Sequence, residues 1–339
     1  MLVNTAKSAD EALYVTARTI DLYGVPQKSR NGDVLRVDGP VTTILERPER
    51  RVLFDHLRDA NPFFHLYESL WMLAGRNDLA PLVKYVKQMA EYSDDGGKTQ
   101  NAAYGHRWRH ARGVATDHDQ LVVICEDLRA NRSSRQEVLQ IWDHARDLGT
   151  QTKDHACNLV ATFQTSVDGK LDMVVFCRSN DVIWGLCGSN LVHFSMLLEY
   201  VARRSGLEMG TQTHVSVNYH AYCDKYLPLR ERWHTEPRPT WDRYSTGGQF
   251  ADVKAVPIAD GLLDTTWDED CQLIVTHDGR APKVPAFKND WFAAVPYPMI
   301  LAHDAYKDGD PERALRCLEA CVASDWRQAC EEWIMRRMK

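Results

Sequence analysis

The strongest constraint on the fold of this chain is a β-hairpin signal near its middle. Two runs rich in apolar and β-branched residues, 157–167 and 171–177, flank the dipeptide Asp168-Gly169. Because Asp-Gly favours the tight turns that join antiparallel strands, this pattern predicts a hairpin. Shorter runs of the same kind predict further strands at 136–142, 213–219 and 272–276.

Helical segments alternate with these strands. Apolar residues recur along each helical segment at spacings of three and four, and each segment begins at a residue that can cap a first turn. The alternation predicts one mixed α/β (α+β) unit over 1–339, with a long excursion at 235–261. The predicted helices run from Asn61-Pro62 to Ala74 with Gly75 as the stop, from Ser189 or Asn190 to about Gly206, and from Asp310-Pro311 onward as the final helix, with Ala314, Leu315, Leu318 and Val322 inside.

Composition narrows the class of protein. The chain has 339 residues, of which 44% are hydrophobic, enough to bury a sizeable core. Its net charge of −6 argues against a protein that coats nucleic acid. Nine cysteines without paired or metal-ligand spacing indicate free thiols in a reducing compartment and no metal site. Without a run of about eighteen apolar residues, we expect no membrane span and a cytoplasmic protein, either cellular or virus-encoded and acting in the host cytoplasm.

Reactive groups gather directly after the hairpin. Arg178 and Ser179 follow its second strand and can bind a phosphate, and a cation beside a thiol also lowers the pKa of that thiol. Cys157, at the start of the first strand, lies across the predicted hairpin from Arg178. His220 and Tyr222 are two positions apart, so they point the same way on a strand. Together these residues indicate a nucleotide site with a cysteine nucleophile.

Each of these residues also has an ordinary structural explanation. Cys157 taken alone is more often a buried small hydrophobe. Glu68 lies beside an apolar helix face; it either turns to solvent or faces inward, where it would suit general acid/base chemistry. His220 and Tyr222 would make a satisfied core pair, and Arg135 a solvated cation in a loop.

Four motifs in a fixed order favour the functional interpretation. They are Tyr67-Glu68-Ser69-Leu70-Trp71, Tyr104-Gly105-His106-Arg107-Trp108-Arg109, Arg178-Ser179-Asn180-Asp181 and His220-Ala221-Tyr222. Over about 30–222 the chain resembles the thymidylate synthase family, which includes the pyrimidine-nucleotide hydroxymethylases. The resemblance implies a thymidylate synthase-like fold whose central twisted mixed sheet forms the interface of an obligate homodimer with shared active sites. It fades from about 235 onward.

The resemblance also implies an enzyme that transfers one carbon to C5 of a pyrimidine nucleoside monophosphate, with 5,10-methylenetetrahydrofolate as cosubstrate. Cys157 would add to C6 of the base, with Arg178 beside the thiolate. Glu68 would manage protons through ordered water, and Tyr104 would help to remove the C5 proton. The implied ligands are Arg30, Arg178 and Ser179 for the phosphate, with Arg135 from the partner subunit, Asn190 for the base, His220 and Tyr222 for the ribose hydroxyl, and Asp181 for the folate.

Several departures from the family pattern bear on the last chemical step. Asn158 follows the nucleophile where synthases carry His, and 84–100 contains no tryptophan to wall the reactive carbon from water. Three further departures are Gln136 in place of a phosphate arginine, Gly188-Ser189-Asn190 in place of a Pro-Phe-Asn loop that is one residue shorter, and a segment, 333–339, unlike the apolar tail that closes over a synthase site. Each of these departures points to a wetter cavity.

A wetter cavity favours hydroxymethylation of CMP, dCMP or dUMP over methylation of dUMP to dTMP. The thymidylate-forming reaction is the nearest alternative, because it shares every step up to the arrival of water or hydride. A non-catalytic nucleotide-binding relative is the alternative of another class. The presence of both Cys157 and Glu68 argues against it. An amide such as Asn190 can offer a donor or an acceptor, so it leaves the choice between uracil and cytosine open.

Overall fold

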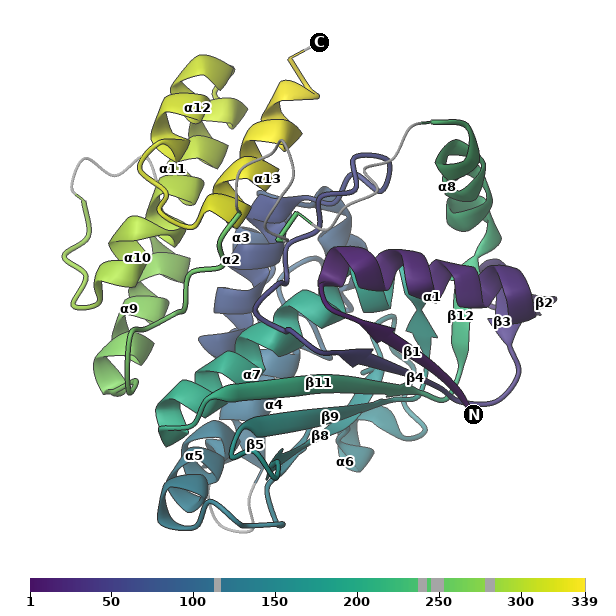
Figure 1. The fold of residues 1–339 in the computed structure, drawn as a ribbon, viewed down its shortest axis with the longest axis horizontal. Coiled ribbons are helices and arrows are strands. Elements are labelled where there is room, and N and C mark those ends of the chain that lie inside the picture. Colours follow the sequence, from purple (N-terminus) through teal and green to yellow (C-terminus); the bar gives the residue numbers. More distant parts are fainter. Residues whose placement is uncertain (113–116, 237–242, 245–252, 278–283, 339) are drawn as a thin grey trace.

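The computed structural model describes residues 1–112, 117–236, 243–244, 253–277 and 284–338. Its largest sheet has six strands in the order β1-β4-β11-β9-β8-β7, and Figure 1 shows helices α1 and α7 along the same side of it. Parallel and antiparallel pairs both occur, so the sheet is mixed, as predicted. Its strands are β1 (Leu2–Ala6), β4 (Val41–Leu45), β11 (Met209–Ser216), β9 (Leu171–Cys177), β8 (Asn158–Thr165) and β7 (Val138–Gln140).

The predicted hairpin is confirmed. Strands β8 and β9 pair antiparallel, and Asn158 stands opposite Cys177 at the end far from the turn. Gly169 in the turn has a φ of 84°, a left-handed conformation that glycine adopts without steric cost. Cys157 and Arg178 lie next to each other at this end of the hairpin. The Arg178 N–H donates to the Cys157 carbonyl oxygen at 2.9 Å.

A second sheet brings three distant segments to one region, in the order β10-β12-β3-β2. Asp181 pairs with His220 across a parallel bridge. The predicted strand at 213–219 is divided between two sheets, because its last residue, Tyr219, begins β12. The strands of this sheet are β10 (Asn180–Asp181), β12 (Tyr219–Tyr222), β3 (Gly32–Val37) and β2 (Gly24–Ser29); β5 (Ala111–Arg112) and β6 (Asp117–His118) form a separate pair.

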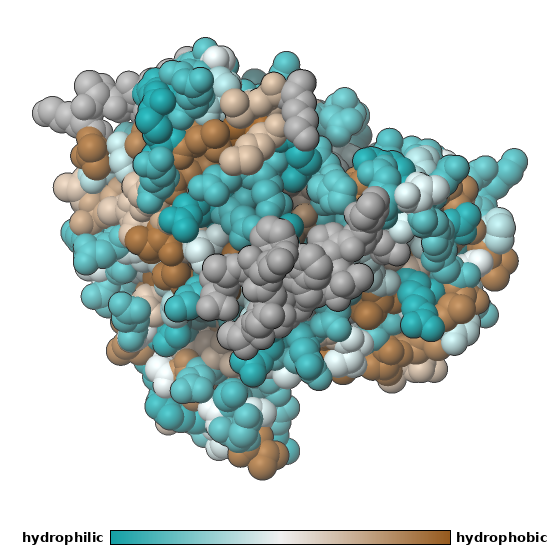
Figure 2. Space-filling view, turned by 45° about the horizontal axis from the view of Figure 1, so that its top comes forward, coloured by the Kyte–Doolittle hydropathy of each residue, from teal (hydrophilic) through white to brown (hydrophobic). Residues whose placement is uncertain are grey.

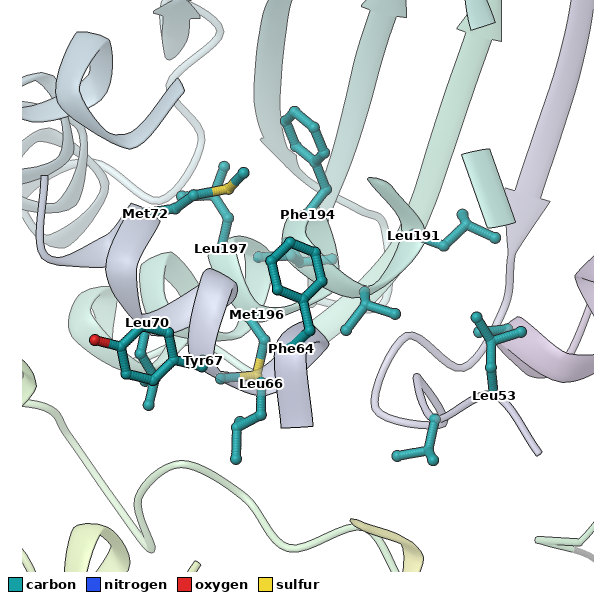
Figure 3. Close-up of a cluster of buried hydrophobic side chains, with 14 of the residues drawn as sticks. Leu53, Phe64, Leu66, Tyr67, Leu70, Met72, Leu191, Phe194, Met196 and Leu197 are labelled. Atoms are coloured by element: carbon teal, nitrogen blue, oxygen red, sulfur yellow. The ribbon is translucent and has the colours of Figure 1, made fainter. Parts of the chain in front are cut away.

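Helix α2 (Pro62–Leu73) is the central helix of the core, and all of its residues are buried. Asn61 accepts a hydrogen bond from the Phe64 N–H and Pro62 occupies the first turn, so the predicted start is confirmed. Helix α1 (Ala9–Tyr23) packs on β1 and β4, while α7 (Leu191–Ser205) lies between the sheet and α2. Figure 3 shows the apolar side chains where α2 meets α7, among them Phe64, Leu66, Tyr67, Leu70, Met72, Leu191, Phe194, Met196 and Leu197.

The prediction that Ser189 or Asn190 caps the next helix is wrong. The helix begins earlier, as the π-helix η2 (Val182–Asn190), and continues directly into α7. Its cap is Asp181, which accepts a hydrogen bond from the Trp184 N–H at 2.6 Å. The predicted end at Gly206 is confirmed, with a φ of 70°. Because Asn190 lies inside the helix and does not cap it, its side chain points into the core instead.

Helices after 264 form a layer that packs against α2 (Figure 1). The predicted strand at 272–276 is wrong, since this segment is the end of helix α9 and both Trp267 and Ile274 are buried two turns apart. A short apolar run does not distinguish a strand from a buried helix. Helix α12 begins at Pro311 as predicted but is not the final one, and Val322 lies exposed beyond it. These helices are α9 (Thr265–Thr276), α10 (Asp290–Ala294), α11 (Pro296–Lys307), α12 (Pro311–Leu318) and α13 (Ser324–Met335).

One stretch, Val182–Ser205, is long and apolar enough to cross a membrane, but 83% of its most apolar window is buried inside the protein, which is typical of a core helix. Figure 2 shows a face that is mainly hydrophilic, with hydrophobic residues in separate patches. The excursion at 235–261 lies in large part outside the described residues. The remaining helices are α3 (Ala80–Val83), η1 (Lys87–Tyr92), α4 (Tyr104–Arg109), α5 (Gln120–Ala130), α6 (His144–Asp147) and α8 (Cys223–Thr235).

Candidate active site

Cys157 and Arg178 meet at the open end of the β8–β9 hairpin, as the sequence predicted. The Cys157 sulfur lies 3.9 Å from Arg178 Nη2. Carbonyl oxygens hold the guanidinium in place, because Nε donates to Ala156 at 2.8 Å and Nη2 to His155 at 3.2 Å. Burial raises the pKa of the Cys157 thiol above its usual value, and the charge of Arg178 offsets part of this rise. The thiol is therefore half-buried beside a fixed cation, which is the environment of a reactive cysteine.

An aromatic ring that sequence reasoning missed completes this corner. The Arg178 guanidinium carbon lies 5.7 Å from the centre of the Trp142 ring, and Trp142 also stacks on His155 with ring centres 6.5 Å apart. The segment 84–100 lacks tryptophan, but Trp142, which follows β7, places an indole beside the Arg178 guanidinium. Its position depends on the pairing of β7 with β8, which the sequence spacing does not reveal.

The segment that contains Tyr104 docks against the residues preceding Cys157. The Cys157 N–H donates to the Tyr104 hydroxyl at 3.4 Å, and the Ala102 N–H donates to Asp154 Oδ2 at 2.7 Å. Burial and the nearby Cys157 raise the pKa of Tyr104 well above its usual value, so the phenol stays protonated. Burial also raises the pKa of Asp154 to about 6. Tyr104 therefore reaches the thiol region as predicted, together with a carboxyl group that the sequence analysis did not single out.

Glu68 faces inward, which decides between its two predicted orientations. It lies on the buried helix α2 and is 5% exposed. His193 on α7 meets it, with Nε2 3.1 Å from Glu68 Oε2, although the alignment falls short of a hydrogen bond. A second buried imidazole, His65, lies edge-on to His193, and burial lowers its pKa well below the usual value. Since His193 lies one helical turn after Asn190, that spacing was the signal that could have identified it.

Asn190 stands in the middle of a row of buried amides. Asn158 Nδ2 donates to Asn190 Oδ1 at 3.3 Å, and Asn190 Nδ2 donates to Asn180 Oδ1 at 3.4 Å. Asn180 Nδ2 in turn donates to Ser216 Oγ at 3.0 Å. None of the four side chains is more than 7% exposed. Asn180 belonged to the quoted Arg178–Asp181 motif without a role, and the structure gives it one as a neighbour of Asn190.

The π-helix η2 contains Gly188-Ser189-Asn190, the loop that the sequence analysis expects to be one residue longer than in synthases. A π-turn holds one residue more than an α-turn and is common at functional sites. Gly188 is required there, because a Cβ would lie 2.6 Å from Arg58 Nη2 and 2.7 Å from the Ile183 carbonyl oxygen. Arg58 donates to that carbonyl at 3.0 Å, and its guanidinium lies 5.1 Å from the centre of the half-exposed Trp184 ring.

His220, Tyr222 and Asp181 come together where β10 meets β12. The His220 and Tyr222 rings are edge-on with centres 5.2 Å apart, so the two side chains share a direction as predicted. His220 Nδ1 lies 3.0 Å from Asn218 Oδ1. Asp181 accepts from the N–H groups of Trp184 and Tyr222. Burial lowers the pKa of His220 and raises that of Asp181, while each favours the charged form of the other.

The remaining predicted ligands are placed at different distances from the thiol. Ser179 adjoins Arg178, and its carbonyl accepts from the Cys177 thiol. Arg30 is exposed on the β2–β3 turn, where its charge still lowers the pKa of Cys157. Arg135 is exposed before β7; because β7 runs antiparallel to β8, this places it toward the hairpin turn and away from Cys157. In one chain, therefore, Arg135 does not join the other residues.

Comparison with known proteins gives a consistent result. Residues 58–252 match the model of the thymidylate synthase family. The chain is 43% identical to a deoxyuridylate hydroxymethyltransferase of Pseudomonas phage M6, over 98% of this chain and 93% of that protein. It is 39% identical to a deoxyuridylate hydroxymethyltransferase of Bacillus phage SP01, over 58% of this chain and 55% of that protein.

A cellular relative is more distant. The chain is 26% identical to a thymidylate synthase of Cereibacter sphaeroides, over 67% of this chain and 82% of that enzyme. The match to the family model ends at residue 252, whereas the likeness to the Pseudomonas phage protein covers 98% of this chain. The predicted family is confirmed: this chain belongs to the thymidylate synthase family.

Proposed function

We propose that this enzyme, a one-carbon transferase, adds a hydroxymethyl group to C5 of deoxyuridylate. Two of its relatives are named for that reaction. The observation that carries the proposal is the half-buried Cys157 thiol 3.9 Å from the fixed guanidinium of Arg178. Pyrimidine C5 is a poor nucleophile until a thiolate adds at C6, so an activated cysteine is the first requirement of the reaction. The two phage relatives also support a virus-encoded enzyme acting in the host cytoplasm.

Cys157 begins the reaction by forming a bond from its sulfur to C6 of the base. Arg178 stabilises the thiolate before the bond forms, and with Ser179 and Arg30 it binds the phosphate of the nucleotide. The addition makes C5 nucleophilic, and 5,10-methylenetetrahydrofolate, when bound, supplies the carbon that C5 attacks. Tyr104 accepts a hydrogen bond from the Cys157 N–H and stays protonated, so it is placed to orient, through its hydroxyl, the water that removes the C5 proton.

Loss of the C5 proton and cleavage of the bond between the transferred carbon and the folate nitrogen, which keeps the electron pair as tetrahydrofolate leaves, produce an exocyclic methylene on the covalently held base. Water must then reach this methylene. A water molecule is stable in a buried site only with two to four polar partners. Asn158 Oδ1, which is unpaired in the described part of the chain, offers such a partner on one side, and the Glu68–His193 pair on another. Glu68 is positioned to take a proton from that water. Addition of hydroxide to the methylene, with return of the electron pair to release the Cys157 thiolate from C6, completes the turnover.

The folate has a chemically suitable surface near η2. The Trp184 indole is 50% exposed, so it presents a flat apolar face, and Arg58 covers it on one side. Asp181, three residues earlier, is an acceptor of the kind that the N–H groups of a pteridine require. We assign the folate to this surface, with Trp184 as the stacking residue and Asp181 as the hydrogen-bond acceptor.

The outer face of the six-stranded sheet supports the proposed homodimer. Helices α1 and α7 pack on one face of this sheet, and because side chains alternate along each strand, every second side chain points to the other face. Phe176 is 39% exposed there and Val138 is 51% exposed. A row of β-branched and aromatic residues on an open sheet face is typical of a protein interface. The row consists of Val3, Thr5, Thr42, Ile44, Thr213, Val215, Val174, Phe176, Val160, Thr162 and Val138.

Product analysis tests the proposed reaction. The purified enzyme is incubated with methylenetetrahydrofolate and each of dUMP, dCMP, UMP and CMP, and the nucleotide is examined by mass spectrometry. We expect dUMP to gain the mass of CH2O without formation of dihydrofolate. A gain of CH2 with equal dihydrofolate would make the enzyme a thymidylate synthase. If the protein binds dUMP but forms no product from any of the four nucleotides, it is the non-catalytic nucleotide-binding relative.

Subunit mixing tests the shared site. Arg135→Gln removes the phosphate ligand that each subunit would give to its partner, and Cys157→Ala removes the nucleophile. Each variant alone should be inactive or nearly so. After the two are denatured together and refolded, half of the dimers are mixed and each holds one intact site, so about a quarter of the wild-type activity should return. Absence of recovery, with mixed dimers shown by mass, would place Arg135 outside the partner's site.

A further inference from the structure

The row of buried amides does more than hold Asn190 in place. Each of its three hydrogen bonds runs in the same direction: Asn158 donates to Asn190, Asn190 to Asn180, and Asn180 to Ser216. An amide oxygen only accepts and an amide nitrogen only donates. If Asn190 alone turned over, two nitrogens would face each other at Asn158 and two oxygens at Asn180. The orientation of Asn190 is therefore linked to that of both neighbours.

We propose that Asn158, Asn180 and Ser216 form a relay that fixes which atom of the Asn190 amide meets each atom of the base, and so makes the site select uracil over cytosine. This inference rests on the proposed function for the identity of the substrate. Asn190 keeps one N–H and one lone pair beyond the relay. Uracil offers an acceptor at O4 and a donor at N3, and cytosine offers the reverse pattern. Selection of one base therefore requires one fixed orientation of Asn190.

The buried ends of the relay favour its observed direction. Asn158 is fully buried, and its Oδ1 has no hydrogen-bond partner among the described residues. Reversal of the whole relay would instead leave the two N–H bonds of the Asn158 amide unpaired. An orphaned buried N–H is rarer in proteins than an orphaned carbonyl oxygen. At the other end, the Ser216 hydroxyl can donate or accept, so it permits either direction. Asn158 is thus the residue that sets the direction.

The two ends of the Asn190 amide allow a matched pair of substitutions. In Asn158→Asp, the new carboxylate only accepts, so Asn190 must turn its Nδ2 toward it and the relay reverses. In Asn180→Asp, the carboxylate accepts from Asn190 Nδ2 and from the Ser216 hydroxyl, so the observed direction is kept. Both variants add the same carboxyl group to the same buried row. They are predicted to differ in their effect on the choice of base, because only Asn158→Asp reverses the relay.

Affinity and turnover are both measured at pH 8, where the new carboxyl groups ionise more readily. The dissociation constants of dUMP and dCMP are obtained by calorimetry, and kcat/KM is obtained for each nucleotide with methylenetetrahydrofolate. Asn158→Asp should raise the preference for dCMP relative to dUMP by roughly 10- to 100-fold, the value of one or two reversed hydrogen bonds. Asn180→Asp should leave the preference for dUMP unchanged or stronger.

A third variant covers the case in which Asn158→Asp does not fold. Asn158→Ala removes the anchor and lets Asn190 turn, so discrimination between the two bases should shrink roughly tenfold. Loss of a buried, hydrogen-bonded amide should also lower the melting temperature, and a single cooperative melting transition will show that the variant is folded. Equal shifts in both aspartate variants, or unchanged discrimination in a folded Asn158→Ala, would overturn the relay. Calorimetry tests the relay independently of the proposed reaction, because it measures the preference between dUMP and dCMP without turnover. If the wild-type enzyme binds dUMP more tightly than dCMP but forms no hydroxymethyl product, only the proposed reaction is refuted.

Discussion

The two sides of the candidate site differ in their electrostatics. On the thiol side, Cys157, Arg178, Tyr104 and Asp154 are ionisable, and their pKa values or charges depend on one another. On the amide side, Asn158, Asn190, Asn180 and Ser216 are neutral, almost completely buried and joined in a row. Bond-making requires groups whose charge can change, whereas recognition of a base requires donors and acceptors that stay fixed. Substitutions on the two sides should therefore change different quantities.

The largest expected effect is on the thiol side. Cys157→Ala should lower kcat by roughly 10⁴-fold or more, because no other group can form the bond to C6. The dissociation constant for dUMP should change only a few-fold, since the phosphate and amide ligands remain. Single-turnover kinetics and calorimetry measure the two quantities. Residual turnover within tenfold of the wild type would show that Cys157 is not the nucleophile.

The second-largest effect is expected from removal of the Arg178 charge. Arg178→Gln should raise the pKa of the Cys157 thiol by about 1–3 units, the usual effect of an adjacent charge, and lower kcat/KM by roughly 100-fold. The rate of thiol alkylation by iodoacetamide against pH gives the pKa directly. Arg178→Lys is the matched control, because it keeps the charge and loses the paired hydrogen bonds to Ala156 and His155. An unchanged alkylation profile in Arg178→Gln would contradict the assignment.

Glu68→Gln tests the proton-handling pair, which borders both sides. Removal of a general acid/base group costs roughly 10²-fold or more in kcat, and the KM for dUMP should change little. His193→Gln provides the partner variant of a double-mutant cycle. If the pair acts as one unit, the double variant should be no slower than the worse single variant. Independent, multiplying losses would separate His193 from the role of Glu68.

Asp154→Asn should have the smallest effect on turnover and a clear effect on pH dependence. Burial raises the pKa of Asp154 to about 6. A carboxyl group with a raised folded-state pKa favours the folded protein at low pH, and this contribution is lost as the pH rises through about 6. The amide that replaces the carboxyl group stays neutral at every pH. The variant should therefore be more stable than the wild type by about 1–3 kcal/mol at pH 8 but not at pH 4.

The same variant should lower the pKa of Cys157, because the charge of Asp154 raises it in the wild type. Denaturant titrations at pH 4 and pH 8 and an alkylation profile measure these two outcomes. An asparagine keeps the oxygen that accepts from the Ala102 N–H, so the docking of this segment is retained. If the stability difference between Asp154→Asn and the wild type were the same at pH 4 and pH 8, the Asp154 carboxyl group would not be the source of the pH dependence.

Some parts of the fold were predictable because their signals are local. The β8–β9 hairpin depends on an Asp-Gly turn, and the start of α2 depends on Asn61 followed by Pro62. The 272–276 segment was predicted wrongly, because a five-residue apolar run carries no period that distinguishes strand from helix. The start of the helix before Asn190 was also predicted wrongly, since the sequence does not reveal that a π-helix joins Asp181 to α7.

By itself, the sequence determined the family, the order of the motifs and the positions of the candidate nucleophile and the cation beside it, because these depend on residue type and on spacing along one hairpin. Only the tertiary structure decided that Glu68 faces His193, that Trp142 lies beside the Arg178 guanidinium and that Asn190 is joined to Asn158 and Asn180. These contacts connect segments far apart in the chain. Their geometry follows from how β7, β8, β10, α2 and α7 pack, and side-chain packing between distant elements leaves no periodic pattern in the sequence.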